Sequence, residues 1–334
     1  MKRANSILKI GSGKLLLLCF FGFLIFPSCG RTQKSKTDEA EKQASEPANW
    51  AERLGYPAGK RVLMFHADDF GMCKEANDAT IKLFENNEIH AAAAMPPCPG
   101  FEEAIEWAKK HPNVDVGLHL ALTSEMRIPK WGAVTDPNEV LGLLNSEGHF
   151  YSNVEGVVEN ATAEEVEKEL RAQIEKSLAM GYTPGHLDGH MGTIWGTTGF
   201  TKAFLKLAQE YDIPARVMTN PEERELPEEQ IELIKNYPGP KLDRFVPIPN
   251  PGTYEGMRDG FMEMIKNLEP GISEIYFHPQ VKSERSEQIT RVWQTRVWEY
   301  ELFGDPVVKK FLEQEDVLYT DWIEMNKRFK EMKK

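Results

Sequence analysis

Cysteine is scarce in this sequence, and the spacing that would indicate a cysteine zinc site is missing. The 334-residue chain has four cysteines, and no two of them form a Cys-x-x-Cys pair: Cys19, Cys29, Cys73 and Cys98. Thiolate zinc sites usually take their ligands from such closely spaced pairs. A cysteine-based zinc site is therefore not expected, and any metal site is expected to use other side chains.

Positively charged residues are also in the minority. The chain has 40 lysines and arginines and 52 aspartates and glutamates, which gives a formal net charge of −12. Proteins that bind nucleic acid need basic surfaces to neutralise phosphates. The charge balance therefore argues against nucleic acid and strongly anionic polymers as main partners. The composition is otherwise that of an ordinary globular protein, with 41% hydrophobic and 28% charged residues.

A hydrophobic run long enough to be an ordinary membrane span is missing as well. The run from Leu15 to Phe26 is shorter than the roughly 20 residues that a spanning helix needs. Basic residues, among them Lys2 and Arg3, precede the run. A basic start followed by a short apolar run is typical of a secretory signal.

The end of this run, Pro27-Ser28-Cys29-Gly30, resembles a bacterial lipoprotein signal. The resemblance implies cleavage before Cys29, a lipid on its sulfur, attachment to a membrane and a place in the bacterial cell envelope, on the periplasmic face or the cell surface. Plain secretion with an unmodified cysteine is the alternative. We therefore expect a signal peptide at 1–28, a flexible tether at 29–55 and one folded domain at 56–334.

Two cysteines, Cys73 and Cys98, would then remain in an oxidising compartment. A disulfide between them is an option there. The sequence does not fix the distance between the two residues, so their pairing stays open.

No internal repeat and no second domain boundary are visible, and apolar strands alternate with helices from residue 62 onward. Strands are expected at 62–65, 89–95, 114–122, 185–191, 215–219, 245–248, 274–277 and 317–320. The helical patterns between them include a capping-box sequence at Thr162 and Glu165. Such alternation predicts a parallel sheet with right-handed crossovers. About seven or eight units over roughly 270 residues predict an α/β fold of the TIM-like (β/α) barrel type, with a single catalytic domain.

Two adjacent carboxylates, Asp68 and Asp69, follow the first predicted strand in the run Arg61–Gly71. Ligand sites in α/β folds lie beyond the carboxyl ends of the strands, which places this pair where chemistry occurs. Adjacent residues leaving a strand point in different directions, so one can bind a metal while the other acts as a base. A solvated turn is the alternative, because Asp and Gly are common in turns.

Histidines recur at the ends of other predicted strands. His119 lies in an apolar strand, His278 ends another, and His186, Asp188 and His190 occupy alternate positions in Gly185–Met191. If that segment is extended, its three polar side chains share one face. A structural histidine is the alternative for His119, but polar groups repeated at one edge of the barrel favour a metal site with supporting side chains.

These motifs resemble the YdjC-like carbohydrate deacetylases, which include the diacetylchitooligosaccharide deacetylases, and the resemblance runs from about residue 60 to 321. Its carriers are His66-Ala-Asp-Asp-Phe-Gly71, Gly117-Leu-His-Leu-Ala-Leu-Thr123, Pro184-Gly-His-Leu-Asp-Gly-His190 and Phe277-His-Pro279. The resemblance implies a TIM-barrel-like fold and one divalent metal ion, Mg²⁺ or Zn²⁺. The sequence departs from the family at Met191–Trp195, where many members have further histidines, and in the insertions at 124–151 and 220–251.

Carried over residue by residue, the resemblance makes Asp69, His119 and His190 the metal ligands and Asp68 the general base. His278 matches a late histidine that donates a proton or stabilises the oxyanion. The residues left over, His186 and Asp188, would support the ligands from behind. Trp131 and Trp195 are candidates for stacking on a sugar, although each could simply pack in the core.

The chemistry expected from this resemblance is hydrolysis of a linear amide C–N bond, or of an ester, in an N- or O-acetylated sugar or oligosaccharide. The metal would polarise the acetyl carbonyl and activate a bound water as the nucleophile, and Asp68 would accept its proton. One rival function is a metal-dependent esterase or amidase for non-sugar acyl groups. The other is a non-catalytic, lipid-anchored glycan-binding protein. The glycan, the metal and the oligomeric state stay open, with a homodimer as one option.

Overall fold

The computed structural model describes residues 47–334. The expected signal peptide, Cys29 and most of the expected tether lie outside the described residues. Within residues 47–334, none of the helices has the length and apolar character needed to cross a membrane.

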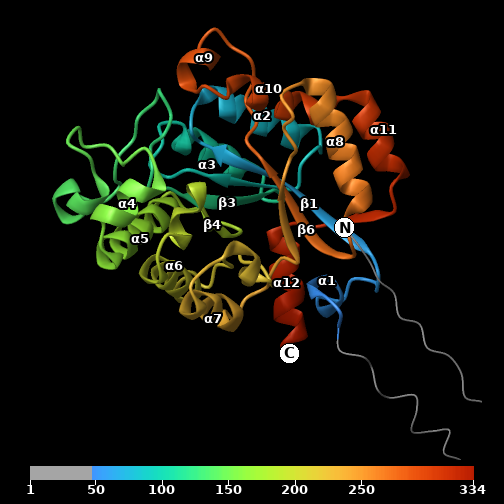
Figure 1. Ribbon diagram of the computed structural model, residues 1–334, viewed down its shortest axis with the longest axis horizontal. Coiled ribbons are helices and arrows are strands. Elements are labelled where there is room, and N and C mark those ends of the chain that lie inside the picture. The colour runs from blue at the N-terminus through green and yellow to red at the C-terminus, as the bar shows by residue number, and fades with distance from the viewer. Residues whose placement is uncertain (1–46) are drawn as a thin grey trace, which may run out of the picture. The chain divides into compact units, whose positions relative to one another are not determined.

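A parallel sheet forms the centre of the described domain (Figure 1). Its strands are β1 (Arg61–Phe70), β2 (Ala91–Ala94), β3 (Asp115–Leu120), β4 (Leu187–Gly189), β5 (Arg244–Pro247), β6 (Gly271–Phe277) and β7 (Val317–Tyr319). The strand order is β4-β3-β2-β1-β6-β5, and β7 pairs with the first residues of β1. The unbroken apolar character of β1 fits its position, because a strand covered on both faces must be apolar on both.

The two ends of this curled sheet are linked by isolated bridges rather than by a full strand. Leu187 of β4 pairs with Ala215, and Met218 pairs with Leu242, which lies just before β5. The prediction of a strand at 215–219 is therefore wrong. The segment forms one isolated bridge to Leu187 and another to Leu242 instead of a continuous strand pairing. The curled parallel sheet, with helices around it, confirms the predicted TIM-like α/β barrel.

Helices cover the sheet on its outer side (Figure 1). The helices of more than one turn are α2 (Lys74–Glu85), α3 (Phe101–Lys110), α4 (Val154–Asn160), α5 (Ala163–Ala179), α6 (Thr198–Glu210), α7 (Glu228–Asn236), α8 (Tyr254–Asn267), α10 (Trp293–Gly304), α11 (Pro306–Gln314) and α12 (Trp322–Met332). The predicted capping box is confirmed, because Thr162 and Glu165 bond to each other's backbone N–H at the start of α5.

A short helix, α1 (Trp50–Arg53), lies inside the segment that the sequence predicts to be a tether. The backbone N–H of Trp50 donates to the Asp243 carboxylate, and the indole is buried against Phe329. The prediction of a flexible tether is therefore wrong for these last residues, since a buried aromatic and a hydrogen-bonded helix start fix them to the domain.

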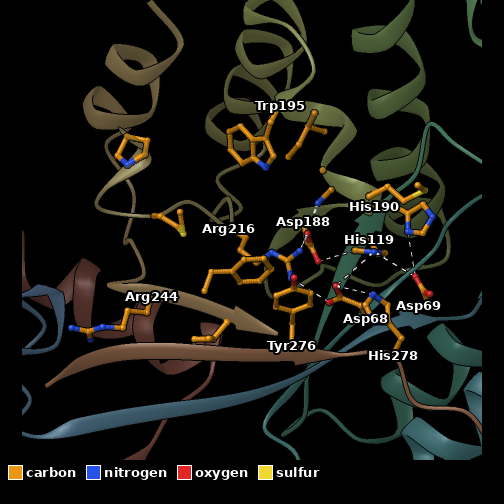
Figure 2. Close-up of a pocket in the computed structure, with 18 of the residues that line it drawn as sticks. Asp68, Asp69, His119, Asp188, His190, Trp195, Arg216, Arg244, Tyr276 and His278 are labelled. Carbon is orange, nitrogen blue, oxygen red and sulfur yellow. Dashed lines mark hydrogen bonds and ion pairs between the residues drawn. The ribbon is translucent and has the colours of Figure 1, made fainter. Parts of the chain in front are cut away.

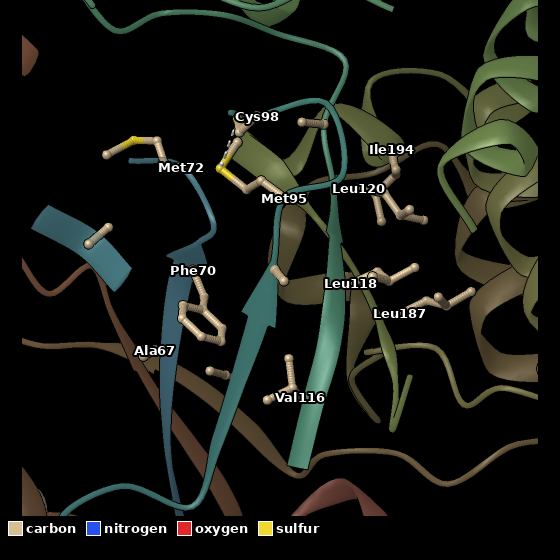
Figure 3. Close-up of a cluster of buried hydrophobic side chains, with 14 of the residues drawn as sticks. Ala67, Phe70, Met72, Met95, Cys98, Val116, Leu118, Leu120, Leu187 and Ile194 are labelled. Carbon is tan, nitrogen blue, oxygen red and sulfur yellow. Dashed lines mark hydrogen bonds between the residues drawn. The ribbon is translucent and has the colours of Figure 1, made fainter. Parts of the chain in front are cut away.

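The main core fills the space between the strands and the outer helices. Figure 3 shows Phe70, Val116, Leu118 and Leu187 on neighbouring strands of this core. Cys98 lies in the same cluster, 3.9 Å from the Met95 sulfur.

Cys98 and Cys73 are both free and buried, so no disulfide joins them. Burial raises the pKa of Cys73 to about 11 and that of Cys98 well above its usual range. Both groups are therefore neutral thiols that pack in the core.

Candidate active site

The two adjacent carboxylates lie within β1, which runs further than the strand predicted at 62–65. Asp68 and Asp69 are 3% and 0% exposed, so the solvated-turn alternative is wrong. Asp69 has a φ of 61°, and the pairing of β1 with β2 shifts register between Ala67 and Phe70. This left-handed residue breaks the alternation of the strand, and the two side chains reach different partners.

Three buried atoms converge beside Asp69. The ligand-type atoms of Asp69, His119 and His190 all lie within 4.8 Å of one another. Asp69 Oδ1 lies 3.5 Å from His119 Nε2 and 3.3 Å from His190 Nδ1. Each of these three atoms is buried without a hydrogen-bond partner. Buried polar atoms are normally satisfied, so three unsatisfied ones facing a common point fit a bound cation.

The donor set also fits a divalent metal ion by its chemistry. One carboxylate and two imidazoles suit zinc and related ions, and three protein ligands leave positions open for water and substrate. Burial lowers the pKa of His190, but Glu125 and Asp69 outweigh it and raise that pKa to about 10. The surroundings of His190 thus favour positive charge at this point.

Each of the three candidate ligands is held from behind by a further side chain. His119 Nδ1 lies 2.7 Å from Asp188 Oδ2, and His190 Nε2 lies 2.9 Å from Glu125 Oε2. Arg296 donates from Nη2 to Asp69 Oδ2 at 2.7 Å. These contacts fix which atom of each ligand faces the common point.

Asp68 faces a different set of groups, in the interior of the barrel. Its Oδ1 lies 2.8 Å from His66 Nδ1. The same oxygen accepts from Arg216 Nη1 at 3.2 Å (Figure 2). The same guanidinium pairs with Asp188 and donates to Glu274. Burial would raise the pKa of Asp68, but Arg216, His119 and His66 outweigh it and hold that pKa well below its usual range.

His278 lies beside Asp68 at the more open side of the site (Figure 2). Its Nε2 is 3.9 Å from Asp68 Oδ2, and its side chain is 33% exposed. Its backbone N–H donates to Glu299 Oε2, and burial raises the pKa of Glu299. An imidazole that reaches both Asp68 and the open space can exchange a proton with a bound molecule.

His186 contacts His66 and Asp115, whereas the sequence predicts that it supports a metal ligand directly. Its Nε2 is 2.8 Å from His66 Nε2, and its Nδ1 is 3.2 Å from Asp115 Oδ1. The segment at 185–191 is extended only in β4, and His190 begins the 3-10 helix η3 (His190–Trp195). The chain turns there, and the contacts of His186 are with His66 and Asp115 rather than with the candidate ligands.

A cavity of about 870 Å³ opens onto both groups of residues. Asp68, Asp69 and His278 lie on its inner side, and Trp195 and Arg244 line it further out (Figure 2). The cavity is large enough for a sugar of more than one ring, since small-molecule sites are typically about 300–1,000 Å³.

The two tryptophans predicted as sugar platforms lie in different places. Trp195 is half-buried and lines the cavity. Trp131 is 3% exposed, donates from Nε1 to the Thr123 carbonyl, and packs edge-on against His190. The prediction that Trp131 stacks on a sugar is therefore wrong, because its faces are covered by protein.

Several residues of the site have no counterpart among the sequence predictions. Glu125 comes from the loop after β3, Arg216 from the linking segment after β4, and Arg296 from α10. Each is a single charged residue outside the quoted motifs, although Glu125 lies only two residues after Thr123. The only available signal was their charge next to apolar residues, which is too common to single them out.

Comparison with known proteins places the chain in a family. A family model described as "YdjC-like protein" matches residues 62–314. A carbohydrate deacetylase of Thermus thermophilus is 28% identical over 78% of this chain and 92% of that protein, and one of Thermoanaerobacter pseudethanolicus is 22% identical over 78% and 98%. One of Brevibacillus brevis is 33% identical, but the match spans 46% of this chain and only 58% of that relative.

One solved structure supports the fold. A protein of Enterococcus faecalis V583, described as a cellobiose-phosphate cleavage protein, superposes with a TM-score of 0.68 at 24% identity, over 79% of this chain and 98% of that one. The family model covers most of the described domain and includes every candidate ligand. The chain therefore belongs to the YdjC-like protein family.

Proposed function

We propose that this protein is a hydrolase that removes acetyl groups from N- or O-acetylated sugars or oligosaccharides with the help of one divalent metal ion. The observation that carries the proposal is the convergence of three unpartnered ligand atoms, from Asp69, His119 and His190, beside an ionised Asp68 in a large cavity. The curated relatives named as carbohydrate deacetylases support the same reaction.

A divalent ion held by these three residues would polarise the acetyl carbonyl and lower the pKa of a water molecule. Asp68 would accept a proton there, and this role is supported by its Oδ2, which lies 3.9 Å from His119 Nε2 and 3.9 Å from His278 Nε2. His66 and Arg216 hold the other carboxylate oxygen, which fixes the direction of Oδ2. We assign Asp68 as the general base on this geometry.

His278 would deliver a proton to the departing amine or alkoxide. Its ring touches Asp68 on one side and lines the cavity on the other. Its backbone is tied to Glu299, which keeps the ring at the cavity wall.

The outer cavity carries aromatic and cationic side chains that suit a sugar. Phe245 and Tyr276 are stacked with ring centroids 4.1 Å apart, and Arg216 lies over Phe245 at 4.4 Å. Trp195 lines the same cavity from η3. Flat apolar surfaces next to hydrogen-bond donors match the faces and hydroxyls of a sugar ring. We propose Trp195 as a contact for the sugar.

The test combines metal analysis with an acetate-release screen. The purified protein, supplied with Mg²⁺ or Zn²⁺, is incubated with N-acetylglucosamine oligomers, O-acetylated sugars and simple aryl esters. We expect acetate from an acetylated sugar, and none from the His119→Ala variant under the same metal supply. The variant Asp316→Asn, at an exposed carboxylate, is the control.

Two outcomes would support the rival functions. Faster release from aryl esters than from every acetylated sugar would indicate an esterase or amidase for non-sugar acyl groups. Glycan binding by metal-loaded protein without acetate release from any substrate would indicate a binding protein on an inactive enzyme fold.

A further inference from the structure

A row of four buried titratable side chains runs away from the candidate base into the barrel. It passes from Asp68 through His66 and His186 to Asp115, and its three contacts are 2.8, 2.8 and 3.2 Å long. All four side chains are at most 3% exposed. None of the four is one of Asp69, His119 and His190, although His66 and Asp68 form, with Asp188, a second buried group whose ligand-type atoms lie within 4.8 Å of one another.

Counting protons along this row gives a definite result. In each of the three contacts one atom must donate a proton, and an ionised carboxylate can only accept. If both carboxylates are ionised, each imidazole donates from its Nδ1 to its own aspartate. The two Nε2 atoms then face each other at 2.8 Å and need a third proton between them. Two neutral imidazoles carry only two protons on nitrogen, so the pair holds one more.

We propose that His66 and His186 share this extra proton, so that the pair is a buried cation behind Asp68. The role of the pair for catalysis rests on the proposed function of Asp68, whereas the shared proton does not. In that role the two histidines are positioning residues: His66 orients Asp68 Oδ1, and the charge of the pair favours the ionised carboxylate.

The third proton could instead lie on a carboxyl, which would leave both imidazoles neutral. Asp68 Oδ1 also accepts from Arg216 Nη1, which favours the ionised form of Asp68, so the Asp115 carboxyl is the alternative place. An imidazole is intrinsically more basic than an aspartate by about 2.6 pKa units. Asp115 Oδ2 also accepts from the backbone N–H of Trp322 at 2.7 Å, so both oxygens of this carboxyl act as acceptors. Both facts place the proton on the imidazole pair.

The charged groups around the row also favour an additional proton on the imidazole pair. Glu274 on β6 and Asp188 on β4 add two carboxylates, and Asp321 at the start of α12 faces Asp115. Arg216 contacts three of the interior carboxylates, those of Asp68, Asp188 and Glu274. One guanidinium cannot balance so many buried negative charges, so an additional proton is favoured. Burial alone would lower the pKa of His66, but Glu274 and Asp68 outweigh it and raise that pKa.

The fold makes room for this row by omitting side chains. A Cβ at Gly117 would lie 2.5 Å from the His186 ring, and one at Gly185 would collide with Asp115 Oδ1. The His186 ring also stacks on Trp322, with centroids 5.5 Å apart. The two glycines of the sequence motifs therefore serve the buried row rather than the metal ligands.

The test is nitrogen-15 NMR of histidine-labelled protein carrying its metal as purified, between pH 5.5 and 8.5. We expect proton-bearing Nδ1 atoms in both rings and Nε2 signals that correspond to one shared proton at pH 7. The exposed His111 is the control, and its His111→Gln variant should leave these signals unchanged. Two neutral rings, with the proton on Asp115, would overturn the proposal.

Two variants connect the shared proton to Asp68. In His186→Gln an amide donates to His66 Nε2, so we expect His66 to become neutral and the acidic limb of the pH–rate profile to move to higher pH. In Asp115→Asn the negative charge is lost, and one acceptor oxygen remains where two faced His186 Nδ1 and the Trp322 N–H, so the extra proton should leave at a lower pH than in the wild type. Unchanged spectra in Asp115→Asn would contradict the proposal, even if His186→Gln fails to fold.

The NMR result does not depend on catalysis. Absence of acetate release would refute the proposed function and leave the shared proton standing. Two neutral imidazole rings in an active enzyme would refute the shared proton and leave the proposed function standing.

Discussion

Asp68 and Asp69 are neighbours in the sequence, but their side chains lie in different surroundings. Asp69 points to two unpartnered imidazole nitrogens and is held by Arg296. Asp68 is held by His66 and Arg216. The left-handed backbone at Asp69 separates them, so the two residues can do different work with the same functional group.

This division predicts opposite behaviour of two matched variants. Asp69→Asn should lose metal and activity together, because it weakens one of three ligands. Asp68→Asn should keep the metal and lose about 10²–10⁴-fold in kcat, as expected for a general base. Metal content and kcat are measured for both under the same metal supply. If Asp68→Asn loses the metal and Asp69→Asn keeps it, the two roles are reversed.

Part of this site was predictable and part was not, for a physical reason. His119 is visible in the sequence because it interrupts an apolar run, and His190 because it alternates with His186 and Asp188. The supporting residues Glu125, Arg216 and Arg296 come from loops and a helix, where charged residues are ordinary. Their partners depend on how the barrel brings distant segments together, which no local pattern records.

At the scale of secondary structure, the contact between β1 and the residue before β2 depends on pH. His90 Nδ1 accepts from the Phe65 backbone N–H, and the ring stacks on Tyr319 with centroids 4.6 Å apart. Burial lowers the pKa of His90 to about 4. Between pH 4 and about 6.5 the ring is therefore neutral in the folded protein, whereas the same histidine in the unfolded chain would be protonated.

The stability that His90 provides should be complete above the ordinary histidine pKa of about 6.5 and should fall as the pH drops towards 4, by at most about 3 kcal/mol. His90→Gln keeps an acceptor for Phe65 but cannot be protonated, so its free energy of unfolding should fall less with acid. Denaturant titrations from pH 4.5 to 7.5 measure the difference, with the exposed His111→Gln as control. Equal pH slopes for wild type and His90→Gln would contradict this prediction.

The strands were predicted well where an apolar run is continuous and poorly where pairing is partial. The run at 62–65 marks β1, although the strand continues to Phe70. The segment at 215–219, in which Arg216 interrupts the apolar residues, makes only single bridges, through Ala215 and Met218. An apolar run indicates that a segment is buried. A segment can be buried without pairing to a neighbouring strand along its whole length.

For the whole molecule, a metal at the proposed site should raise the stability of the fold. A ligand that binds only the folded state, present at 1,000 times its Kd, stabilises by about 4 kcal/mol. Removal of the metal with a chelator should therefore lower the Tm, and Zn²⁺ or Mg²⁺ should restore it. The His119→Ala variant should lose this metal-dependent rise. A full rise in that variant would place the metal elsewhere.

We also propose that the chain is anchored in the cell envelope by a lipid on Cys29, on the basis of the sequence pattern alone. Cys29→Ser should then move the protein from the membrane fraction to the soluble fraction, because anchoring requires acyl chains. Fractionation of cells that express each form, with the buried Cys73→Ser variant as control, measures the change. A Cys29→Ser protein that stays in the membrane after high-salt washing would refute the anchor.

The bridges at Ala215 and Met218 also affect where the barrel wall can open locally. A strand ladder opens only when several hydrogen bonds break together, whereas these bridges offer few to break. Arg216 lies between them and ties this seam to Asp68 on β1 and Glu274 on β6 through ion pairs. We therefore expect amide deuterium exchange along the inner wall to be fastest at the seam. A few backbone hydrogen bonds, among them Arg216 N–H to the Leu187 carbonyl at 2.8 Å, and the ion pairs of Arg216 close that wall together.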